Sequence, residues 1–405
     1  MAIDRIRKVA IVGGGVMGRG IALLTSQKGV YTIVKETNVD LSSRARESIF
    51  EKIDKAGPKL LCPSPQFAKD RISVTTEFSD IQDADLVIEA VPEDPSLKED
   101  VFREIDVWVK PDALIVSNTS SLSVSEMAKA TSRPGQVMGA HFFNPPVRRN
   151  LVELIRAKPT SEHTFQVVKN LVEQTLERHT IEVKECPGFL VNRVLLPGPN
   201  EAGLLLCETT LGAKEIDNRA RAFGWPLGPF ELLDYIGIDI AFGVAKILHL
   251  AYGDRMKPAP ILEILFNLGR LGNKSGAGFY NNGSDEELVK IVEDNFTDRR
   301  NLSLDDGFDR MLAGQLLEVL RCLEEDIATP EDIEKGCRHG INWPLARDEG
   351  PLHYIQNTLG LTDLLEMSKQ ARDSSQYADR FIPPAILEEM VTKGENKFFE
   401  DEEDW

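Results

Sequence analysis

The sequence has no long apolar run and few cysteines, and each absence excludes a class of protein. A helix that crosses a bilayer needs about 20 consecutive apolar residues, and the chain contains no such run. The five cysteines are Cys62, Cys186, Cys207, Cys322 and Cys337, which form no CxxC motif and no Cys/His ligand spacing. We therefore expect no membrane span, no structural disulfide, no metal site and a reducing, cytoplasmic setting.

Positive charge is also scarce. The chain has 47 Lys and Arg residues against 65 Asp and Glu residues, a formal net charge of −18. Nucleic acids and anionic membranes bind surfaces rich in Lys and Arg, so we expect neither as a partner. The sequence enters a strand pattern within a few residues of Met1, and we expect no signal or transit peptide.

What the chain does contain is a regular alternation of strand and helix patterns. From residue 8 to about residue 184, short β-rich apolar runs alternate with amphipathic helical stretches, which is typical of βαβ units and a parallel sheet. The pattern predicts an α/β, Rossmann-type doubly wound sheet over residues 1–184. Its predicted strands are 8–12, 31–36, 72–76, 85–91, 113–118, 136–140, 150–155 and 179–183.

Helical periodicity dominates the remainder of the chain. The stretch 207–237 is echoed by 323–360, with Leu-rich helices before each, which indicates an internal repeat. The segment between the copies is polar and charged, as expected of a linker or a solvated helix. We predict two related helical domains at 185–281 and 308–395, a linker at 282–307 and an acidic tail at 396–405.

A glycine-rich loop follows the first predicted strand and opens a helix. It places Gly13, Gly15 and Gly18 in GxGxxG spacing. In this context the first glycine permits a tight turn, the second lets the backbone approach a pyrophosphate, and the third lets helix and strand pack closely. Glu36 ends the second strand, where a carboxylate can accept hydrogen bonds from a ribose and would repel a 2′-phosphate. The pattern predicts a site for NAD rather than NADP, although Glu36 could be a polar strand end.

One apolar stretch, GAHFFNPPVRRNLVELI at 139–155, carries a single histidine and a single glutamate. If its two ends pair as antiparallel strands, His141 and Glu153 are symmetric about Val147 and face each other. Glu153 stands among apolar residues, and a buried carboxylate needs a partner. A His–Glu pair beside a nicotinamide could remove a hydroxyl proton while hydride leaves the same carbon. The alternatives are a structural hydrogen bond and a solvated glutamate on an edge strand.

Taken in order, six motifs resemble those of the L-3-hydroxyacyl-CoA dehydrogenase family. They are GGGVMGRGIA, DLVIEAVPED, SNTSSLSV, GAHFFNPP with LVELI, CPGFLVNR and GRLGNKSGAGFY, and together they cover almost all of residues 8–280. The repeat to residue 360 is similar to the duplicated helical domain of longer members, as in the dehydrogenase part of multifunctional β-oxidation proteins. The resemblance implies NAD-dependent oxidation of (3S)-3-hydroxyacyl-CoA to 3-oxoacyl-CoA, in β-oxidation or a related acyl-CoA pathway.

The resemblance also implies roles for single residues. His141 matches the catalytic histidine and Glu153 the acid that orients it, whereas Ser120 and Asn192 match residues at the substrate's 3-oxygen. Tyr354 matches a tyrosine that multifunctional relatives use near the substrate. The residues expected at the cofactor, besides the glycines and Glu36, are Met17, Val91, Glu93, Lys98, Ser120 and Asn144.

Several of these residues have ordinary alternatives. Ser120 could be a helix N-cap, Asn144 could serve the turn before its two prolines, and Asn192 could make an interdomain hydrogen bond. Lys98 could be a solvated helix residue and Tyr354 a core residue.

Two departures from the family pattern bear on substrate choice. Gly198-Pro199 stands where relatives often carry an aromatic residue, and Arg148-Arg149-Asn150 stands where apolar residues and proline are common. The resemblance further implies an acyl-CoA bound between the two domains. It implies a homodimer, or a monomer if the second helical repeat replaces the partner subunit. The other functions considered are a gulonate-type hydroxy-acid dehydrogenase of the same architecture and a non-catalytic dinucleotide-binding scaffold.

Overall fold

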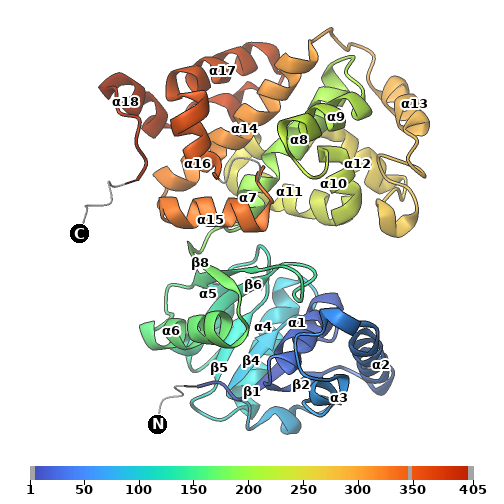
Figure 1. The fold of residues 1–405 in the computed structure, drawn as a ribbon, viewed down its shortest axis with the longest axis vertical. Helices are drawn as coiled ribbons and strands as arrows, with labels where there is room; N and C mark the ends of the chain where they lie inside the picture. The colour runs from blue at the N-terminus through green and yellow to red at the C-terminus, as the bar shows by residue number, and fades with distance from the viewer. Residues whose placement is uncertain (1–4, 345–348, 400–405) are drawn as a thin grey trace. The chain divides into compact units, whose positions relative to one another are not determined.

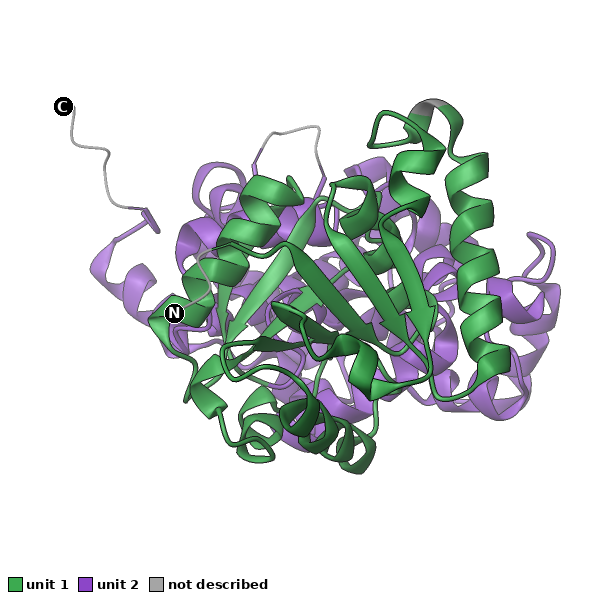
Figure 2. Ribbon diagram, turned by 90° about the horizontal axis from the view of Figure 1, so that it is seen from below, with its two compact units in different colours: residues 1–186 green, residues 187–405 purple. Residues whose placement is uncertain are grey.

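The computed structural model describes residues 5–344 and 349–399. By its internal contacts the chain divides into two units, with the boundary between Cys186 and Pro187. Figure 1 labels most of the helices and strands, and Figure 2 draws the two units in different colours. Residues 400–405 of the predicted acidic tail, and residues 345–348 of the second repeated stretch, lie outside the described part of the chain.

Unit 1 contains one sheet of eight strands, in the order β3-β2-β1-β4-β5-β6-β7-β8, among the residues described. Neighbouring strands are parallel except for β6 and β7, which are antiparallel. All eight predicted strands are confirmed, and their ends lie within two residues of the predicted ones. Their bounds are β1 (Lys8–Val12), β2 (Tyr31–Lys35), β3 (Ile72–Thr75), β4 (Leu86–Glu89), β5 (Leu114–Ser117), β6 (Val137–Phe142), β7 (Leu151–Arg156) and β8 (His179–Lys184).

The sheet is buried on both faces, and this explains its apolar strands. Every residue of β4 and β5 is buried, because crossover helices cover both sides of a parallel sheet. The strand order reverses between β1 and β4, and ligands of such folds bind outside the carboxyl ends of the strands at this switch point. The connecting helices are α1 (Val16–Gln27), α2 (Val39–Lys55), α3 (Pro65–Lys69), α4 (Pro95–Trp108), α5 (Val124–Lys129) and α6 (Glu162–Asn170), with short turns η1 (Gly57–Lys59), η2 (Phe78–Ile81), η3 (Pro134–Gln136) and η4 (Leu171–Thr175).

Unit 2 is helical throughout its described residues, apart from isolated bridges. The segment predicted as a linker contains α13, whose Leu288 and Val292 are buried. The helices are α7 (Val191–Leu195), α8 (Pro197–Glu208), α9 (Ala213–Phe223), α10 (Pro229–Ile236), α11 (Ile238–Tyr252), α12 (Pro260–Asn267), α13 (Glu286–Asn295), α14 (Leu304–Glu324), α15 (Pro330–Gly340), α16 (Pro351–Tyr354), α17 (Leu361–Ser374) and α18 (Ala385–Lys393), with η5 (Gly253–Met256), η6 (Asn273–Ser275), η8 (Ile355–Leu359) and η9 (Ala378–Phe381).

The two repeated stretches of unit 2 share a specific contact. In the first, the carboxylate of Asp217 on α9 accepts hydrogen bonds from the N–H groups of Phe230 (2.9 Å) and Glu231 (3.3 Å) at the start of α10. In the second, Glu334 on α15 accepts one from the N–H of Leu352 (2.6 Å) at the start of α16. A carboxylate stabilises a helix N-terminus because it satisfies N–H groups that have no partner within the helix.

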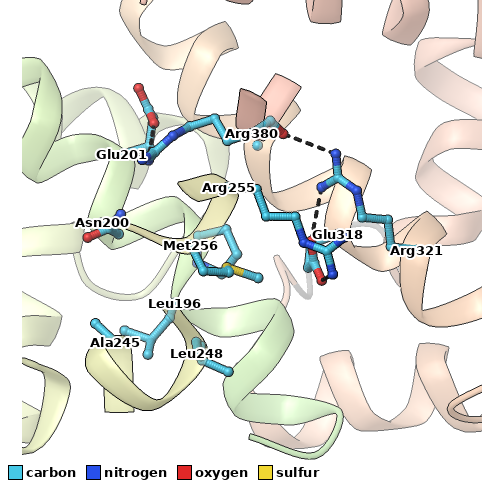
Figure 3. Close-up of a pocket in the computed structure, with 12 residues that line it drawn as sticks. Leu196, Asn200, Glu201, Ala245, Leu248, Arg255, Met256, Glu318, Arg321 and Arg380 are labelled. Carbon is cyan, nitrogen blue, oxygen red and sulfur yellow. Dashed lines mark hydrogen bonds and ion pairs between the residues drawn. The ribbon is translucent and has the colours of Figure 1, made fainter. Parts of the chain in front are cut away.

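Buried ion pairs join the two repeats of unit 2. Arg310 on α14 contacts Glu201 and Glu208 on α8, at 2.5 and 2.7 Å. Glu201 also binds Arg380 at 2.8 Å, and Figure 3 shows this contact beside a small cavity that Glu318 also lines. Charges inside a protein are tolerated only when they are paired, so α8 and α14 depend on each other.

No single helix in the described part of the chain is long and apolar enough to cross a bilayer. Among the described residues, one pair of helical segments, α10 and residues 238–256, is long and apolar enough when taken together. These two segments meet at a bend of 101°.

Candidate active site

The loop between β1 and α1 has a geometry that only glycine permits. Gly13 has a φ of +103°, and a Cβ there would lie 2.6 Å from the carbonyl oxygen of Ala90. A Cβ on Gly18 would lie 1.9 Å from the carbonyl oxygen of Gly13. By contrast, nothing lies within 4 Å of a Cβ built on Gly15, the N-cap of α1. The loop is closed around its first and third glycines and open at the second, which fits a bound pyrophosphate.

Glu36 holds this loop in place. Its Oε1 accepts a hydrogen bond from the N–H of Gly14 at 2.7 Å, and its Oε2 accepts one from the N–H of Thr37 at 3.1 Å. Glu36 therefore lies beside the glycine loop, as the spacing predicted. Met17, also expected at the cofactor, is partly buried on α1 and packs against the core of unit 1.

A buried ion pair lies at the carboxyl end of β4. Glu89 is fully buried and accepts hydrogen bonds from Lys98 Nζ (2.6 Å), Ser117 Oγ (2.6 Å) and the N–H of Val91 (2.7 Å). Lys98 is only 1% exposed, so the solvated-lysine alternative is wrong. Sequence reasoning missed Glu89, although the only carboxylate in the apolar run LVIEAV signals a buried partner, as it did for Glu153.

Glu93 connects the loops that follow β4 and β5. Its Oε1 accepts hydrogen bonds from Thr119 Oγ1 (2.5 Å), the Ser120 N–H (3.0 Å) and Ser120 Oγ (3.3 Å), and its Oε2 lies 3.3 Å from Lys98 Nζ. Burial raises the pKa of Glu93, but the Lys98 charge and the hydrogen bonds from Thr119 and Ser120 outweigh it and leave that pKa below its ordinary value. Glu93 therefore stays anionic near neutral pH and positions Ser120.

His141 and Glu153 face each other on β6 and β7. They are directly paired in the antiparallel register, so the predicted symmetry about Val147 is confirmed. His141 Nδ1 lies 2.6 Å from Glu153 Oε2, Glu153 is fully buried and His141 is 7% exposed. A carboxylate at Nδ1 keeps the proton on that nitrogen and the ring lone pair on Nε2. The geometry thus makes Nε2 the basic atom of the pair.

Asn118 is a neighbour of this pair that sequence reasoning did not single out. It follows β5, and its Oδ1 accepts a hydrogen bond from the N–H of Phe142 at 3.0 Å. The bond ties the loop that carries Ser120 to the strand that carries His141. The motif SNTSS contains Asn118. Its hydrogen-bond partner on β6 could not be predicted, because the sequence does not show that β5 and β6 are neighbours in the sheet.

The turn after β6 borders a groove of about 540 Å³ in unit 1. Asn144, which is exposed and precedes a cis peptide bond to Pro145, lines the groove together with Arg148. The N–H groups of Arg148 and Arg149 close the turn by donating to the Pro145 carbonyl at 2.9 and 3.0 Å. The other charged residues that line the groove are Glu51, Lys52, Lys55 and Lys59.

Asn192 and Tyr354 belong to unit 2. Asn192 is half-buried on α7. Tyr354 is 7% exposed, and its ring packs against Phe223 and Trp343 at centroid distances of 5.6 and 6.1 Å. Among the residues described, no group of three or more His, Cys, Asp or Glu side chains could hold a metal ion.

A closed glycine loop at the switch point of a doubly wound sheet, with a buried His–carboxylate pair in that sheet, defines a dinucleotide-dependent dehydrogenase. The family model of the 3-hydroxyacyl-CoA dehydrogenase NAD binding domain matches residues 8–186. The model of the C-terminal domain of the same family matches residues 188–282 and 307–398. The chain belongs to the 3-hydroxyacyl-CoA dehydrogenase family, and its first domain is that family's NAD-binding domain.

Individual relatives agree with this membership. The chain is 33% identical over 411 residues to the fatty acid oxidation complex subunit alpha of Psychrobacter sp. (strain PRwf-1). The matched region covers 96% of this chain and 56% of that protein. It thus spans about half the length of the curated relatives it matches.

Solved structures give the same picture. (S)-3-hydroxybutyryl-CoA dehydrogenase PaaH1 from Ralstonia eutropha is similar with a TM-score of 0.65 and 35% identity, over 68% of this chain and 99% of that one. The 3-hydroxybutyryl-CoA dehydrogenase of Escherichia coli has the same fold, with a TM-score of 0.85 at 23% identity, over 96% and 99% of the two chains.

Proposed function

We propose that the protein oxidises (3S)-3-hydroxyacyl-CoA to 3-oxoacyl-CoA with NAD, in fatty-acid β-oxidation or a related acyl-CoA pathway. The buried His141–Glu153 pair is the observation that supports this most. It lies in the sheet whose glycine loop fits a dinucleotide, and Asn118 links its strand to the loop of Ser120. A base at that position suits an alcohol oxidation, in which a proton and a hydride leave one carbinol group.

In the proposed reaction, Nε2 of His141 takes the proton of the 3-hydroxyl group. Glu153 keeps the ring oriented and stabilises the imidazolium that forms. NAD, when bound, accepts the hydride from the 3-carbon. The Ser120 hydroxyl, which donates a hydrogen bond to Glu93 in this structure, can rotate and donate that hydrogen bond to the 3-oxygen of the substrate instead, and Asn192 is assigned to the same oxygen.

The cofactor assignment follows the loop geometry. We propose that Gly13, Gly15 and Gly18 hold the pyrophosphate, Glu36 the adenosine ribose, and Val91, Glu93 and Asn144 the nicotinamide side, with Met17 beneath the loop. Lys98 is buried against Glu89, so we assign it the positioning of Glu89 and Glu93 rather than contact with the cofactor. For Tyr354, which packs among aromatic rings, we propose a place near the substrate pocket.

The charge of Glu36 should decide between the two cofactors. In Glu36→Gln, one side-chain oxygen remains to accept the Gly14 hydrogen bond, but the charge that repels a 2′-phosphate is lost. We expect the ratio of kcat/KM for NADPH to that for NADH to rise by about tenfold, since a repulsion of about 1.4 kcal/mol corresponds to that factor. Steady-state rates with both cofactors measure the ratio, and Glu77→Gln, at an exposed residue between β3 and η2, is the control. An unchanged ratio would count against the ribose assignment.

The groove beside the β6–β7 turn suits the phosphates of CoA. Arg148, Lys52, Lys55 and Lys59 line it, in a chain whose net charge is −18, and only Glu51 opposes them. Positive side chains in a concave site attract phosphate groups. We propose that Arg148, a departure from the family pattern, contacts these phosphates.

Arg148→Ala should raise the KM for acetoacetyl-CoA by about five- to tenfold and leave kcat nearly unchanged, because a contact of equal strength in ground and transition states affects KM alone. The loss should vanish with acetoacetyl-pantetheine, which lacks the nucleotide phosphates. Lys129→Ala, on an exposed part of α5, serves as the control. An equal loss with both substrates would rule out a phosphate contact.

Turnover of the two substrate classes tests the proposed function. The purified protein should reduce acetoacetyl-CoA with NADH, followed by the loss of nicotinamide absorbance. Turnover of L-gulonate with NAD but not of acetoacetyl-CoA would favour the gulonate-type alternative. NADH binding without turnover of either would favour a scaffold.

We also propose the domain division 1–184, 185–281 and 308–395, with 282–307 as a connection that includes α13. The buried ion pairs between α8 and α14 support a monomer in which the second repeat replaces a partner subunit, and a homodimer is the alternative. The cytoplasmic location expected from the cysteines stays a prediction.

A further inference from the structure

A small apolar cavity lies within unit 2, between α8, α14 and the connection from α9 to α10. Its volume is about 30 Å³, room for roughly two carbon atoms. None of the described residues that line it is charged. The lining residues used below are Leu195, Gly198, Pro199, Trp225, Met311 and Gln315.

The cavity lies on the same helix face as Asn192. Only Leu196 separates α7 from α8, and its φ of −66° and ψ of −33° are helical. Leu195 and Pro199 therefore follow Asn192 at i+3 and i+7, on one stripe of two consecutive helices, the second of which begins at Pro197. A rise of 1.5 Å per residue places them roughly 5 and 10 Å beyond Asn192.

The burial pattern of α7 agrees with this stripe. Asn192 and Leu195 are half-buried. The other residues of α7 up to that point are buried, namely Val191, Arg193 and Val194. Asn192 and Leu195 thus form the less buried face of α7, and the stripe becomes buried where it reaches the cavity at Pro199. An extended chain whose 3-oxygen is held at Asn192 can run along it toward the cavity.

The absence of a side chain at Gly198 keeps the cavity open. A Cβ built there would lie 3.4 Å from Gln315 Oε1 and 3.9 Å from Met311 Cγ, both on α14. Any larger side chain would extend into the cavity toward these residues.

The wall opposite is rigid. Trp225 packs edge-on against Trp343, with ring centroids 5.2 Å apart, and Trp343 is only 1% exposed. Trp343 in turn packs against Tyr354 at 6.1 Å. A pocket whose walls are fixed in this way is formed before its ligand arrives.

We propose that this cavity binds the alkyl end of a medium-length 3-hydroxyacyl group, and that Gly198 with Met311 sets the preferred chain length. The inference rests on the proposed function and extends it, because the second repeat then supplies part of the substrate site. Burying one methylene group is worth about 0.8 kcal/mol, or roughly fourfold in affinity. Two carbons in the cavity would favour the longer substrate by roughly tenfold or more.

Two substitutions with opposite effects test the proposal. The readout is the ratio of kcat/KM for 3-oxodecanoyl-CoA to that for acetoacetyl-CoA, with 3-oxohexanoyl-CoA and 3-oxooctanoyl-CoA between them. Gly198→Val should lower this ratio by roughly tenfold, the loss of two buried carbons. Met311→Ala, which enlarges the cavity, should move the optimum to longer chains. Gly198→Ala adds a Cβ that meets only ordinary contacts and should lower the ratio by roughly fourfold. It replaces Gly198→Val in the test if that variant does not fold.

Met390→Ala is the matched control, because it truncates a buried methionine on α18 that does not line the cavity. It should leave the ratio within twofold of wild type. The pocket would be overturned if folded Gly198 and Met311 variants kept the wild-type ratio, or if Met390→Ala shifted the ratio equally. In either case, turnover of acetoacetyl-CoA by the wild-type protein would still uphold the proposed function. A wild-type protein that reduces none of these substrates would overturn both.

Discussion

Replacing His141 by glutamine should lower kcat for acetoacetyl-CoA reduction by about 10²- to 10⁴-fold, the usual contribution of a general acid–base. Glutamine can still hydrogen-bond to Glu153, but it can neither take nor return a proton. In the reduction direction the same imidazole must give its proton to the 3-oxygen. Steady-state and single-turnover rates with saturating NADH measure the loss at the chemical step.

His179→Gln is the matched control for this result, because His179 is an exposed residue of β8. It should keep the wild-type rate. The dissociation constant of NADH, measured by fluorescence, should be the same in His141→Gln and wild type, since the imidazole acts on the substrate hydroxyl. A His141→Gln protein that retains a third or more of the wild-type kcat would show that another group moves the proton.

Arg310→Met should lower the free energy of unfolding by about 3–5 kcal/mol, the cost of removing one partner of a buried ion pair. Arg310 is 1% exposed and contacts Glu201 and Glu208, which are 0% and 3% exposed. Methionine fills much of the volume but leaves carboxylates without their main counter-charge. Chemical denaturation followed by the fluorescence of Trp225 and Trp343 reports the stability of unit 2.

Two comparisons separate this charge effect from a packing effect. Lys129→Met breaks an exposed pair with Glu126 and should cost less than about 1 kcal/mol. Adding Glu208→Gln to Arg310→Met should recover part of the loss, because it removes one unpaired charge. If Arg310→Met is as stable as wild type, the network between α8 and α14 does not hold the repeats together.

The sheet and the pairing of His141 with Glu153 could be predicted because local pattern determines them. A strand buried on both faces is a short apolar run, and β4 and β5 show this plainly. The register of His141 and Glu153 followed from the turn alone, since facing residues of an antiparallel pair have a constant sum. The glycine loop was likewise predictable, because Gly13 and Gly18 occupy positions where a Cβ would collide with backbone.

Contacts between distant segments could not be predicted in this way. In the sequence, Lys98 has the pattern of a solvated residue on an amphipathic helix. Its partner Glu89 lies on β4, and this contact becomes known only when α4 is placed against that strand. Arg193 and Glu318 form a buried pair across 125 residues of sequence, and no periodicity indicates such a partner. No local pattern explained Arg148 either, because the groove that it lines is formed by the β6–β7 turn together with the end of α2, which is distant in the sequence.

The oxidation of (3S)-3-hydroxybutyryl-CoA by the wild-type protein with NAD, followed by the appearance of NADH and compared with the (3R) enantiomer, tests the central claim most directly. In the proposed mechanism, a base at His141 and a fixed 3-oxygen would let only one enantiomer direct the hydrogen of its 3-carbon toward the cofactor. We expect rapid NADH formation with the (3S) substrate and none above background with the (3R) substrate. No NADH from either substrate, or equal rates from both, would contradict the account.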